Sequence, residues 1–321
     1  MSMTARYTIT ESILRLSAEI TKLLGRYEGL TLAKPQPKLR RTNRIRTIQG
    51  SLAIEGNTLT FEQVTDVLEG KRVLGPPQDI LEVKNANQAY ERASEFDPYS
   101  IRELLKAHGV LMKGIIPDAG KWRAGSVGIL KGHQVSHIAP KSQYVQGLIK
   151  DLLNWVKTSK TTPLITSSVF HHEFEVIHPF SDGNGRMGRL WQHCLLVHFH
   201  PVFEFVPIES VVRDRQQAYY RSLEKADRAV NSTPFVEFML EAILDGTQEL
   251  LSDLRIAPVK PENRLETAEN HFRTEWFSRK DYRTLFSRLS DPTASRDLKL
   301  GVDLKKLERR GDRALTRYRF K

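Results

Sequence analysis

The feature that most restricts the fold of this chain is a pair of apolar helical runs separated by a glycine-rich loop. The first run follows Pro163, which suits a first helical turn, and has apolar side chains at Leu164, Ile165, Val169, Phe170, Phe174 and Ile177. The loop reads His178-Pro179-Phe180-Ser181-Asp182-Gly183-Asn184-Gly185-Arg186-Met187-Gly188-Arg189. The second run continues through Leu190, Cys194, Leu195 and Val197. We therefore expect a helix, a glycine-rich loop and a second helix in direct succession.

Most of the rest of the chain up to residue 252 is also predicted to be helical, and several of these helices have clear start signals. Ser100 with Glu103 forms a capping box ahead of an apolar helical run. Thr60 with Gln63 does the same for a shorter helix. Further helices are predicted at about residues 38–54, 79–93, 145–157, 186–200, 213–228 and 234–252.

One stretch departs from the helical pattern. Residues 126–130 and 134–138 are separated by Lys131-Gly132-His133 and read as a short β-hairpin. The predicted fold class of the body is mainly α with this one hairpin.

Composition excludes several classes of protein. The 321 residues are 40% hydrophobic and 27% charged, a balance typical of a folded globular protein. No window approaches 18 apolar residues, and the first residues lack a basic and then apolar signal pattern, so the sequence predicts a cytoplasmic protein without a membrane span. A single cysteine, Cys194, excludes an internal disulfide framework and a multi-cysteine zinc site.

Positive charge is concentrated near the C-terminal end. The formal net charge is +11, and residues 271–321 hold 15 Lys and Arg against 7 Asp and Glu. This bias predicts a module that binds a polyanion, although a solvated basic tail has the same composition. A polar, Pro-containing segment near residues 257–262 marks the boundary of this module. The predicted domains are an N-terminal helical region 1–99, a core 100–252, a linker 253–261 and a C-terminal module 262–321.

The glycine-rich loop has the chemistry of a phosphate site. Consecutive backbone N–H groups before a helix N-terminus form an anion nest with a favourable dipole. Asp182 can hold Mg²⁺ through oxygen, while Arg186 and Arg189 can bind phosphate oxygens. His178 can remove a proton near neutral pH. Because no Ser or Cys with an adjacent base lies here, we expect the attacking group to be a hydroxyl of the substrate.

This loop also resembles the signature of the Fic (Fido) family, HPFx[DE]GNGRxxR, at every specified position. The resemblance extends over roughly residues 40–250 and implies a Fic-fold helical core. Fic proteins mostly transfer AMP from ATP onto a Ser, Thr or Tyr hydroxyl of a protein. The resemblance therefore implies an ATP-dependent protein adenylyltransferase, with a homodimer as a further expectation because Fic proteins often self-associate.

The same resemblance assigns roles to individual residues. It implies that His178 is the general base and that Asp182 holds Mg²⁺ on the α- and β-phosphates of ATP. The predicted ATP-binding and phosphate-binding residues are Gly183, Asn184, Gly185, Arg186, Met187, Gly188, Arg189 and Tyr220. Gly183, Asn184 and Gly185 would form the anion hole.

Two further regions match parts of the family. The region of Tyr219, Tyr220 and Asp227 corresponds to the adenine pocket, with Tyr220 the preferred residue, although tyrosines at this spacing also occur in cores. The segment at about residues 119–138 resembles the Fic flap, which binds the target chain as an added strand.

An inhibitory pattern precedes the core. Ser51-Leu52-Ala53-Ile54-Glu55-Gly56-Asn57 matches the motif [ST]xxxE[GN] of Fic proteins that inhibit themselves. Glu55 would pair with Arg189 and remove the partner of the γ-phosphate, so that ATP binds with its α-phosphate misaligned. A plain helix end at Gly56 explains the same residues without a function. Glu55 could also position a water for removal of AMP, since some Fic enzymes with this glutamate catalyse that reaction.

The C-terminal module reads as helix, helix, helix and hairpin, and resembles a winged helix-turn-helix. The possible contacts to double-stranded DNA are Thr293, Ser295, Arg296, Arg310 and Arg313. A winged helix used only for protein contacts or dimerisation is the alternative.

Other functions remain compatible with the sequence. The same site could remove AMP or transfer another phosphate-linked group, and the chain could be a DNA-binding regulator with a nucleotide-sensing core. His171, His172, Glu173 and His178 do not have the HExxH spacing, so these side chains are not expected to bind a metal.

Overall fold

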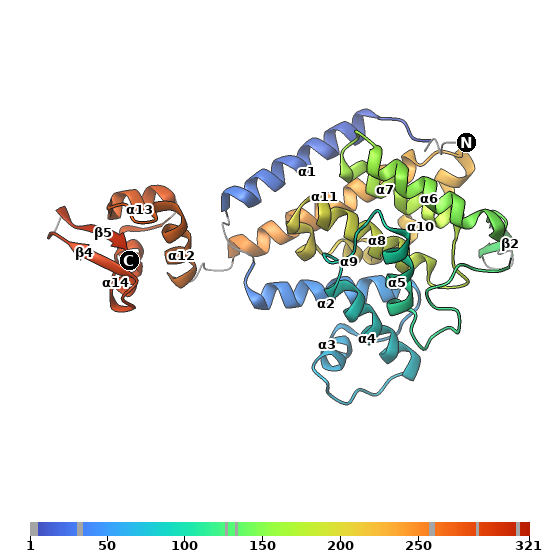
Figure 1. The fold of residues 1–321 in the computed structure, drawn as a ribbon, viewed down its shortest axis with the longest axis horizontal. Helices are drawn as coiled ribbons and strands as arrows, with labels where there is room; N and C mark the ends of the chain where they lie inside the picture. The colour runs from blue at the N-terminus through green and yellow to red at the C-terminus, as the bar shows by residue number, and fades with distance from the viewer. Residues whose placement is uncertain are drawn as a thin grey trace. The chain divides into compact units, whose positions relative to one another are not determined.

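Helices make up most of the computed structural model (Figure 1), which describes residues 6–30, 35–125, 128–131, 134–256, 261–286, 289–312 and 315–321. The chain divides into two compact units. The first is built from residues up to Tyr27 and from Gln36–Ser252, and the second mainly from Asp253–Lys321. No helix in the described part is long and apolar enough to cross a membrane.

The first unit is helical apart from one hairpin. Its helices in chain order are α1 (Glu11–Leu30), α2 (Pro37–Ile54), α3 (Phe61–Leu68), α4 (Pro77–Glu91), α5 (Ile101–Leu111), α6 (Ser142–Thr158), α7 (Pro163–Ile177), α8 (Asn184–Phe199), the 3₁₀ helix η1 (Pro201–Phe205), α9 (Ile208–Asp214), α10 (Gln216–Ala229) and α11 (Thr233–Ile256). The capping box of Thr60 and Gln63 is present in full at the start of α3. The side chain of Ser100 accepts from the backbone N–H of Glu103 at the start of α5. The predicted mainly α fold is confirmed.

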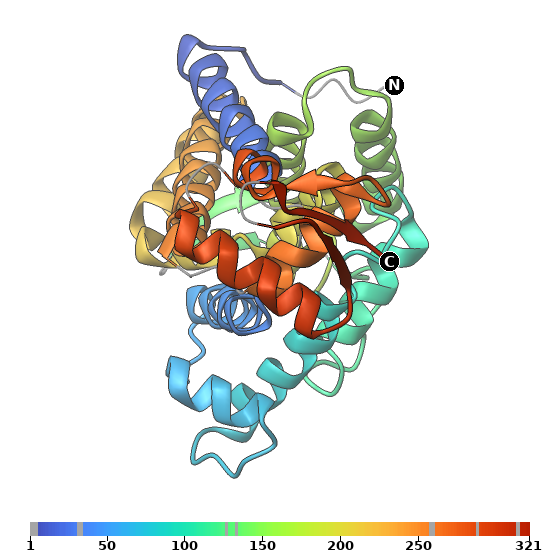
Figure 2. The same cartoon turned by 90° about the vertical axis from the view of Figure 1, so that its left-hand side faces the viewer.

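The two central apolar helices pack closely on each other. A Cβ atom on Gly188 of α8 would lie 2.7 Å from Cδ2 of His171 on α7, so only glycine permits this approach. The views in Figures 1 and 2 place the other helices of the first unit around this pair. The N-terminus of α8 is thereby fixed at the edge of the core.

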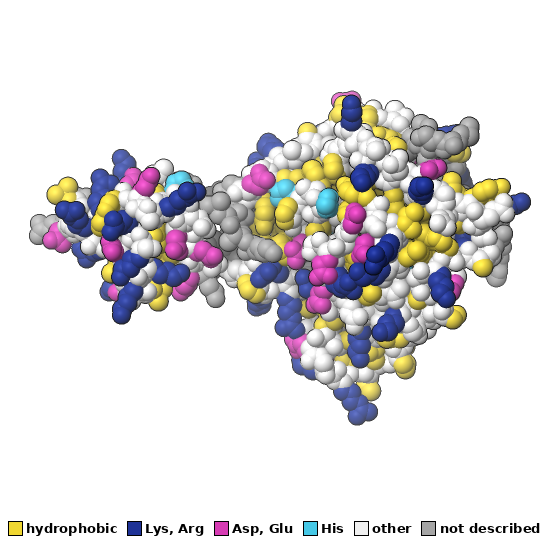
Figure 3. Space-filling view, in the orientation of Figure 1, with side chains coloured by type: hydrophobic (Ala, Val, Ile, Leu, Met, Phe, Trp, Pro, Cys, Tyr) yellow, Lys and Arg dark blue, Asp and Glu magenta, His cyan; other side chains and the backbone are white. Residues whose placement is uncertain are grey.

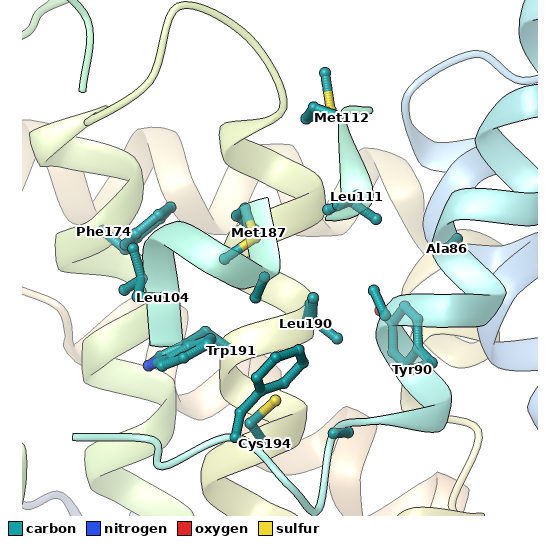
Figure 4. Packing of buried hydrophobic residues seen from close by; sticks show 14 of the residues in the cluster. Ala86, Tyr90, Leu104, Leu111, Met112, Phe174, Met187, Leu190, Trp191 and Cys194 are labelled. Atoms are coloured by element: carbon teal, nitrogen blue, oxygen red, sulfur yellow. The ribbon is translucent and has the colours of Figure 1, made fainter. Parts of the chain in front are cut away.

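A buried cluster holds α4, α5, α7 and α8 together (Figure 4). Figure 4 shows side chains of these four helices converging on the face of α8 that carries Met187, Leu190 and Trp191. Trp191 is fully buried, and its indole N–H donates to the carbonyl of Pro98 at 3.0 Å. The apolar face of α8 therefore sets the position of the loop that precedes it.

Helix α2 ends beside the same loop. A Cβ on Gly50 would lie 2.7 Å from the backbone of Glu209, so α2 and α9 approach at backbone distance. Helix α2 stops at Gly56, whose φ of +93° is favourable only for glycine. This stop places Glu55 at the C-terminal end of the helix.

The hairpin consists of β1 (Gly128–Lys131) and β2 (Gln134–Ile138), paired antiparallel with a register shift between Ile129 and Leu130. The second strand begins where the sequence predicts it. Residues 126, 127, 132 and 133 lie outside the described residues.

The second unit mixes helices with a small sheet. Its elements are α12 (Pro261–Phe272), β3 (Phe277–Ser278), α13 (Arg279–Leu285), α14 (Asp291–Asp303), β4 (Leu307–Arg310) and β5 (Arg317–Phe320). The strand order is β3-β5-β4, with both pairs antiparallel. The predicted order of three helices and a hairpin is present, and β3 adds a short third strand.

Two helical predictions need correction. Helix α1 was not predicted, although its spacing of Ile13, Leu16, Ile20 and Leu24 is helical and these side chains are buried. The helix expected at 213–228 corresponds to α10, and the separate helix α9 that ends just before it was not predicted.

Candidate functional site

The glycine-rich loop connects α7 to α8 through two residues with left-handed backbone conformation. His178 caps α7 with φ +49° and ψ +62°, and Gly183 precedes α8 with φ +81°. The left-handed region costs a non-glycine residue about 1 kcal/mol, so the surrounding contacts must hold His178 in place.

The side chain of Asn184 fixes the shape of the loop. Its Oδ1 accepts from the backbone N–H of Phe180, and its Nδ2 donates to the carbonyl of Phe180, both at 2.9 Å. The side chain is buried. Because the first turn of a helix has N–H groups without partners in the helix, this fold leaves the start of α8 suited to an anion.

Two acidic side chains surround Arg186. Its Nη1 donates to Oε1 of Glu82 at 2.7 Å, and its Nη2 donates to Oδ1 of Asp182 at 3.2 Å. Glu82 also accepts from Nδ2 of Asn57 at 2.8 Å. Arg186 is buried, whereas the side chain of Asp182 is 53% exposed and open to a ligand.

Arg189 is held by the end of α2. Its Nε donates to Oγ of Ser51 at 3.1 Å, and its Nη2 donates to the Ser51 carbonyl at 2.9 Å and to Oε1 of Glu55 at 2.7 Å. The predicted pair of Glu55 and Arg189 is thus present as a direct ion pair. A Cβ on Gly185 would clash with Oε1 of Glu55, so the carboxylate lies against the first turn of α8.

A second buried carboxylate lies near Arg189. Burial and the nearby Glu55 carboxylate together raise the pKa of Glu175 to about 8, although Arg189 acts in the opposite direction. Oε1 of Glu175 has no hydrogen-bond partner in the described part of the protein, and it lies 3.8 Å from Nε2 of His171. Glu175 was not predicted as a site residue, because a single carboxylate on an apolar helix belongs to no recognisable sequence motif.

The ring of His178 is oriented from α7. Its Nδ1 lies 3.4 Å from the carbonyl oxygen of Glu175 and 4.0 Å from Oε2 of the same residue. A carbonyl oxygen only accepts hydrogen bonds, so this contact favours a proton on Nδ1 and makes Nε2 the basic nitrogen.

Two residues that the sequence analysis did not single out support the loop from the other side. His108 stacks on Phe180 with ring centroids 3.6 Å apart, and its Nε2 contacts the carbonyl of Asp182 at 3.0 Å. Its Nδ1 accepts from the backbone N–H of Gly120 at 2.9 Å, and burial lowers its pKa to about 4, so the ring is neutral. Arg123 is buried and donates to the carbonyl of His178 at 2.7 Å. Neither residue lies in a recognisable motif, although His108 falls on the apolar face of its predicted helix.

The remaining predicted residues of the first unit lie around this centre. Tyr220 is 42% exposed and its hydroxyl donates to the carbonyl of Ile54 at 3.0 Å, whereas Tyr219 is buried against His171. Met187 points into the core, as Figure 4 shows. The part that Tyr220, Met187 and Gly188 play in binding ATP stays a prediction.

The histidines of α7 have ordinary buried partners. His171 contacts Gln192 at 2.7 Å, and His172 contacts Ser232 at 3.0 Å. In the part of the chain that the structure describes, no cluster of three or more His, Cys, Asp or Glu side chains could hold a metal ion.

The predicted DNA-contacting residues lie on the second unit. Thr293 and Ser295 are half-buried near the start of α14, and Nη1 of Arg279 donates to Oγ of Ser295 at 3.1 Å. Arg296 and Arg310 are exposed, and neither forms an ion pair with another described residue. Arg313 lies outside the described residues.

The surface charge of this unit is partly neutralised. Figure 3 shows Lys and Arg side chains over its visible face with Asp and Glu between them. Arg283 pairs with Asp291 at 3.1 Å, and Arg319 pairs with Glu308 at 2.6 Å. These pairs engage acidic residues that the count of 15 Lys and Arg against 7 Asp and Glu already includes, so the excess of positive charge remains.

Comparison with known proteins identifies the family of this architecture. A sequence model described as the Fic/DOC family matches residues 98–196. A crystal structure of a Fic family protein from Desulfovibrio desulfuricans G20 is 42% identical, with a TM-score of 0.74 over 99% of this chain and 98% of that chain.

Curated relatives match a smaller part of their own length. "Protein adenylyltransferase fic-1" from Caenorhabditis elegans is 30% identical over 205 residues, which is 59% of this chain and 37% of the relative. "Probable protein adenylyltransferase aq_aa38" from Aquifex aeolicus is 31% identical over 150 residues, 46% of each. The chain thus matches less than two thirds of the length of these relatives.

Proposed function

The chain belongs to the Fic family, and we propose that it is a self-inhibited protein adenylyltransferase that transfers AMP from ATP to a Ser, Thr or Tyr hydroxyl of a protein, itself included. The names of the relatives and the arrangement of His178 beside the α8 N-terminus support this activity. The observation that carries the self-inhibition is the direct contact of Glu55 with Arg189.

His178 acts as the general base in this proposal. The target hydroxyl gives its proton to Nε2 of His178 while its oxygen attacks the α-phosphorus of ATP. The bond between the α-phosphorus and the oxygen that bridges to the β-phosphorus breaks, and pyrophosphate leaves. AMP is then joined to the target oxygen through the α-phosphorus.

The start of α8 binds the phosphates. The N–H groups of its first turn, together with Gly183 and Gly185, face the anion, and Arg186 and Arg189 bind the outer phosphate oxygens. Asp182 fits a Mg²⁺ site because its carboxylate is largely exposed beside this nest, and Mg²⁺ often takes one carboxylate together with substrate phosphates. When bound, the ion would neutralise negative charge on the α- and β-phosphates.

Glu55 inhibits the reaction by occupying Arg189. With its Nη2 donating to Glu55 and to the Ser51 carbonyl, Arg189 keeps only Nη1, which has no partner among the described residues, as a donor toward the γ-phosphate. The Glu55 carboxylate also repels a phosphate at the first turn of α8, because it rests against Gly185. ATP that enters is then bound out of line for attack.

Mass spectrometry of the Glu55→Gly protein after incubation with Mg²⁺ and ATP tests the proposal. We expect a mass increase of one AMP per modified hydroxyl, absent from the Glu55→Gly, His178→Ala double variant. If both proteins gain AMP equally, His178 is not the base. If neither gains AMP while both bind ATP, the transfer reaction is wrong for this chain.

Removal of AMP is a second candidate for the same site. The Glu55 side chain is 32% exposed, so it can position a water molecule that attacks the phosphorus of the AMP group; the bond to the target oxygen breaks, and AMP and the free hydroxyl are released. Wild-type protein should then release AMP from the modified Glu55→Gly protein, and Glu55→Gly should not. An AMP-modified protein that stays intact with the wild type excludes this reaction for that substrate.

Binding of double-stranded DNA by the second unit is a separate proposal. The exposed positions of Arg296 and Arg310 favour it. Retention of duplex DNA by the full chain should fall steeply with salt, and Arg296→Ala with Arg310→Ala should weaken it. Retention that does not depend on salt, or that is equal in the double variant, contradicts this proposal.

A further inference from the structure

The side chain of Arg123 connects the glycine-rich loop to the hairpin, and its hydrogen-bond partners are all backbone carbonyls. Its side chain is 3% exposed. Nε donates to the carbonyl of His178 at 2.7 Å, and Nη2 reaches the carbonyl of Ile177 at 3.4 Å. The backbone N–H of Arg123 donates to the carbonyl of Pro179 at 3.1 Å. One residue thus engages three consecutive carbonyls at the end of α7.

This position suits a buried cation. The last carbonyls of a helix have no partner within the helix, and the negative end of the helix dipole attracts positive charge. No carboxylate among the described residues forms an ion pair with Arg123. The guanidinium is therefore held by carbonyl oxygens, and its planar set of five N–H donors can serve several of them together, which a lysine cannot.

The same guanidinium holds both ends of the hairpin. Nη1 donates to the carbonyl of Gly125, shortly before β1, at 2.7 Å. Nη2 donates to the carbonyl of Pro140, just after β2. One side chain therefore contacts both ends of the hairpin and the backbone of His178.

Ser142 offers a matched comparison. Its Oγ donates to the carbonyl of Ala124 at 2.7 Å, so it also ties the two ends of the hairpin to each other. It forms no hydrogen bond with the loop at His178 among the described contacts. A loss of hairpin anchoring can thus be separated from a loss of the connection to the loop.

We propose that Arg123 is a positioning residue that fixes the hairpin relative to His178, so that a target chain bound along the hairpin presents its hydroxyl to the base. This inference rests on the proposed adenylyltransferase function. It follows that loss of Arg123 lowers the rate of transfer without weakening ATP binding, because no contact joins its side chain to Asp182, Arg186 or Arg189.

The first test measures transfer in the Glu55→Gly protein with Arg123→Gln, Arg123→Lys or Ser142→Ala added. Arg123→Gln should slow self-modification at saturating ATP by at least about tenfold, with the affinity for a non-transferable ATP analogue within about twofold. Arg123→Lys should recover part of the rate, and Ser142→Ala should stay within about twofold of the parent. An unchanged rate in Arg123→Gln, or a parallel loss of analogue affinity, overturns the inference.

Hydrogen exchange supplies a readout that does not need activity. In Arg123→Gln, amides of residues 119–125 and of residues 176–183 should both exchange faster, whereas Ser142→Ala should affect the first group alone. If Arg123→Gln speeds exchange in one group only, Arg123 does not couple them. If the Glu55→Gly protein does not transfer AMP, the proposed function is wrong. The exchange data then still show whether Arg123 couples the hairpin to the loop at His178.

Discussion

The carboxylate of Glu55 lies 2.7 Å from Nη2 of Arg189, across 134 residues of sequence. Arg189 is almost completely buried, whereas the side chain of Glu55 is 32% exposed. The arginine is thus fixed by its surroundings, and the glutamate is the member of the pair that can move away. If this contact inhibits the reaction as proposed, it can be released by movement of Glu55 without disturbing the core.

A graded pair of substitutions at Glu55 tests the role of its charge. Glu55→Gly should raise self-AMPylation by at least about tenfold, because Arg189 regains a donor for phosphate. Glu55→Gln keeps a hydrogen-bond acceptor but loses the charge, so its rate should lie between those of the wild type and Glu55→Gly. Glu91→Gln, which removes an exposed ion pair with Arg44, is the control and should leave the rate unchanged. Equal rates for wild type and Glu55→Gly would show that the pair does not inhibit.

We predict that Asn184 stabilises the glycine-rich loop through its two hydrogen bonds to Phe180. Asn184→Ala leaves the N–H and the carbonyl of Phe180 without the partners they have in the wild type. Each unsatisfied buried group costs about 1–3 kcal/mol, so the melting temperature should fall by several degrees and AMP transfer by the Glu55→Gly protein should be lost when Asn184→Ala is added. Calorimetry and the mass assay measure the two effects. A variant with normal stability and lost transfer would instead indicate a direct contact of Asn184 with phosphate.

The reacting part of the site could be predicted from sequence because it is local. His178, Asp182, Arg186 and Arg189 lie in one stretch, where the order of loop and helix start already fixes their relation. Glu55 is distant, but it lies in a short pattern of its own. For these residues the resemblance to the family motifs carried the prediction, and their part in the reaction stays a prediction.

The supports of the site could not be predicted in this way. His108 reaches Asp182 across 74 residues, and Arg123 reaches His178 across 55. Helical periodicity assigns His108 to a buried face, and it says nothing about which carbonyl its ring will meet. Arg123 precedes a hairpin with no pattern that distinguishes it from a surface arginine. Their roles depend on how α5, α7 and α8 pack.

Glu175 should make stability depend on pH. Its pKa is about 8 in the folded protein and near its ordinary value of 4.5 when unfolded. Between these values the folded chain keeps a proton that the unfolded chain has released, so stability is highest below pH 4.5 and falls as the pH rises toward 8. Glu175→Gln cannot lose stability in this way. The melting temperature of Glu175→Gln minus that of the wild type should therefore be at least about 3 °C larger at pH 8 than at pH 5.5.

The control for Glu175 is an exposed carboxylate. Glu95→Gln should give the same difference from wild type at both pH values. Glu209, whose pKa is raised to about 7 by burial, contributes a loss of the same sign, so some pH dependence should remain in Glu175→Gln. A melting temperature that changes with pH identically in wild type and Glu175→Gln would mean that Glu175 is ionised in the folded protein.

We predict that His108 stabilises the glycine-rich loop through hydrogen bonds and not through a positive charge. His108→Phe keeps an aromatic ring to stack on Phe180, but it leaves the carbonyl of Asp182 and the N–H of Gly120 without this partner. Because these groups are partly buried, the melting temperature should fall and transfer in the Glu55→Gly protein should slow by at least about tenfold. His108→Gln supplies a donor and an acceptor and should recover part of both. The pKa of about 4 means that the ring is neutral throughout pH 5.5–8, so the ratio of the His108→Phe rate to the parent rate should be constant over that range. A ratio that changes near pH 6.5 would show that His108 titrates in the working enzyme and that its burial is incomplete.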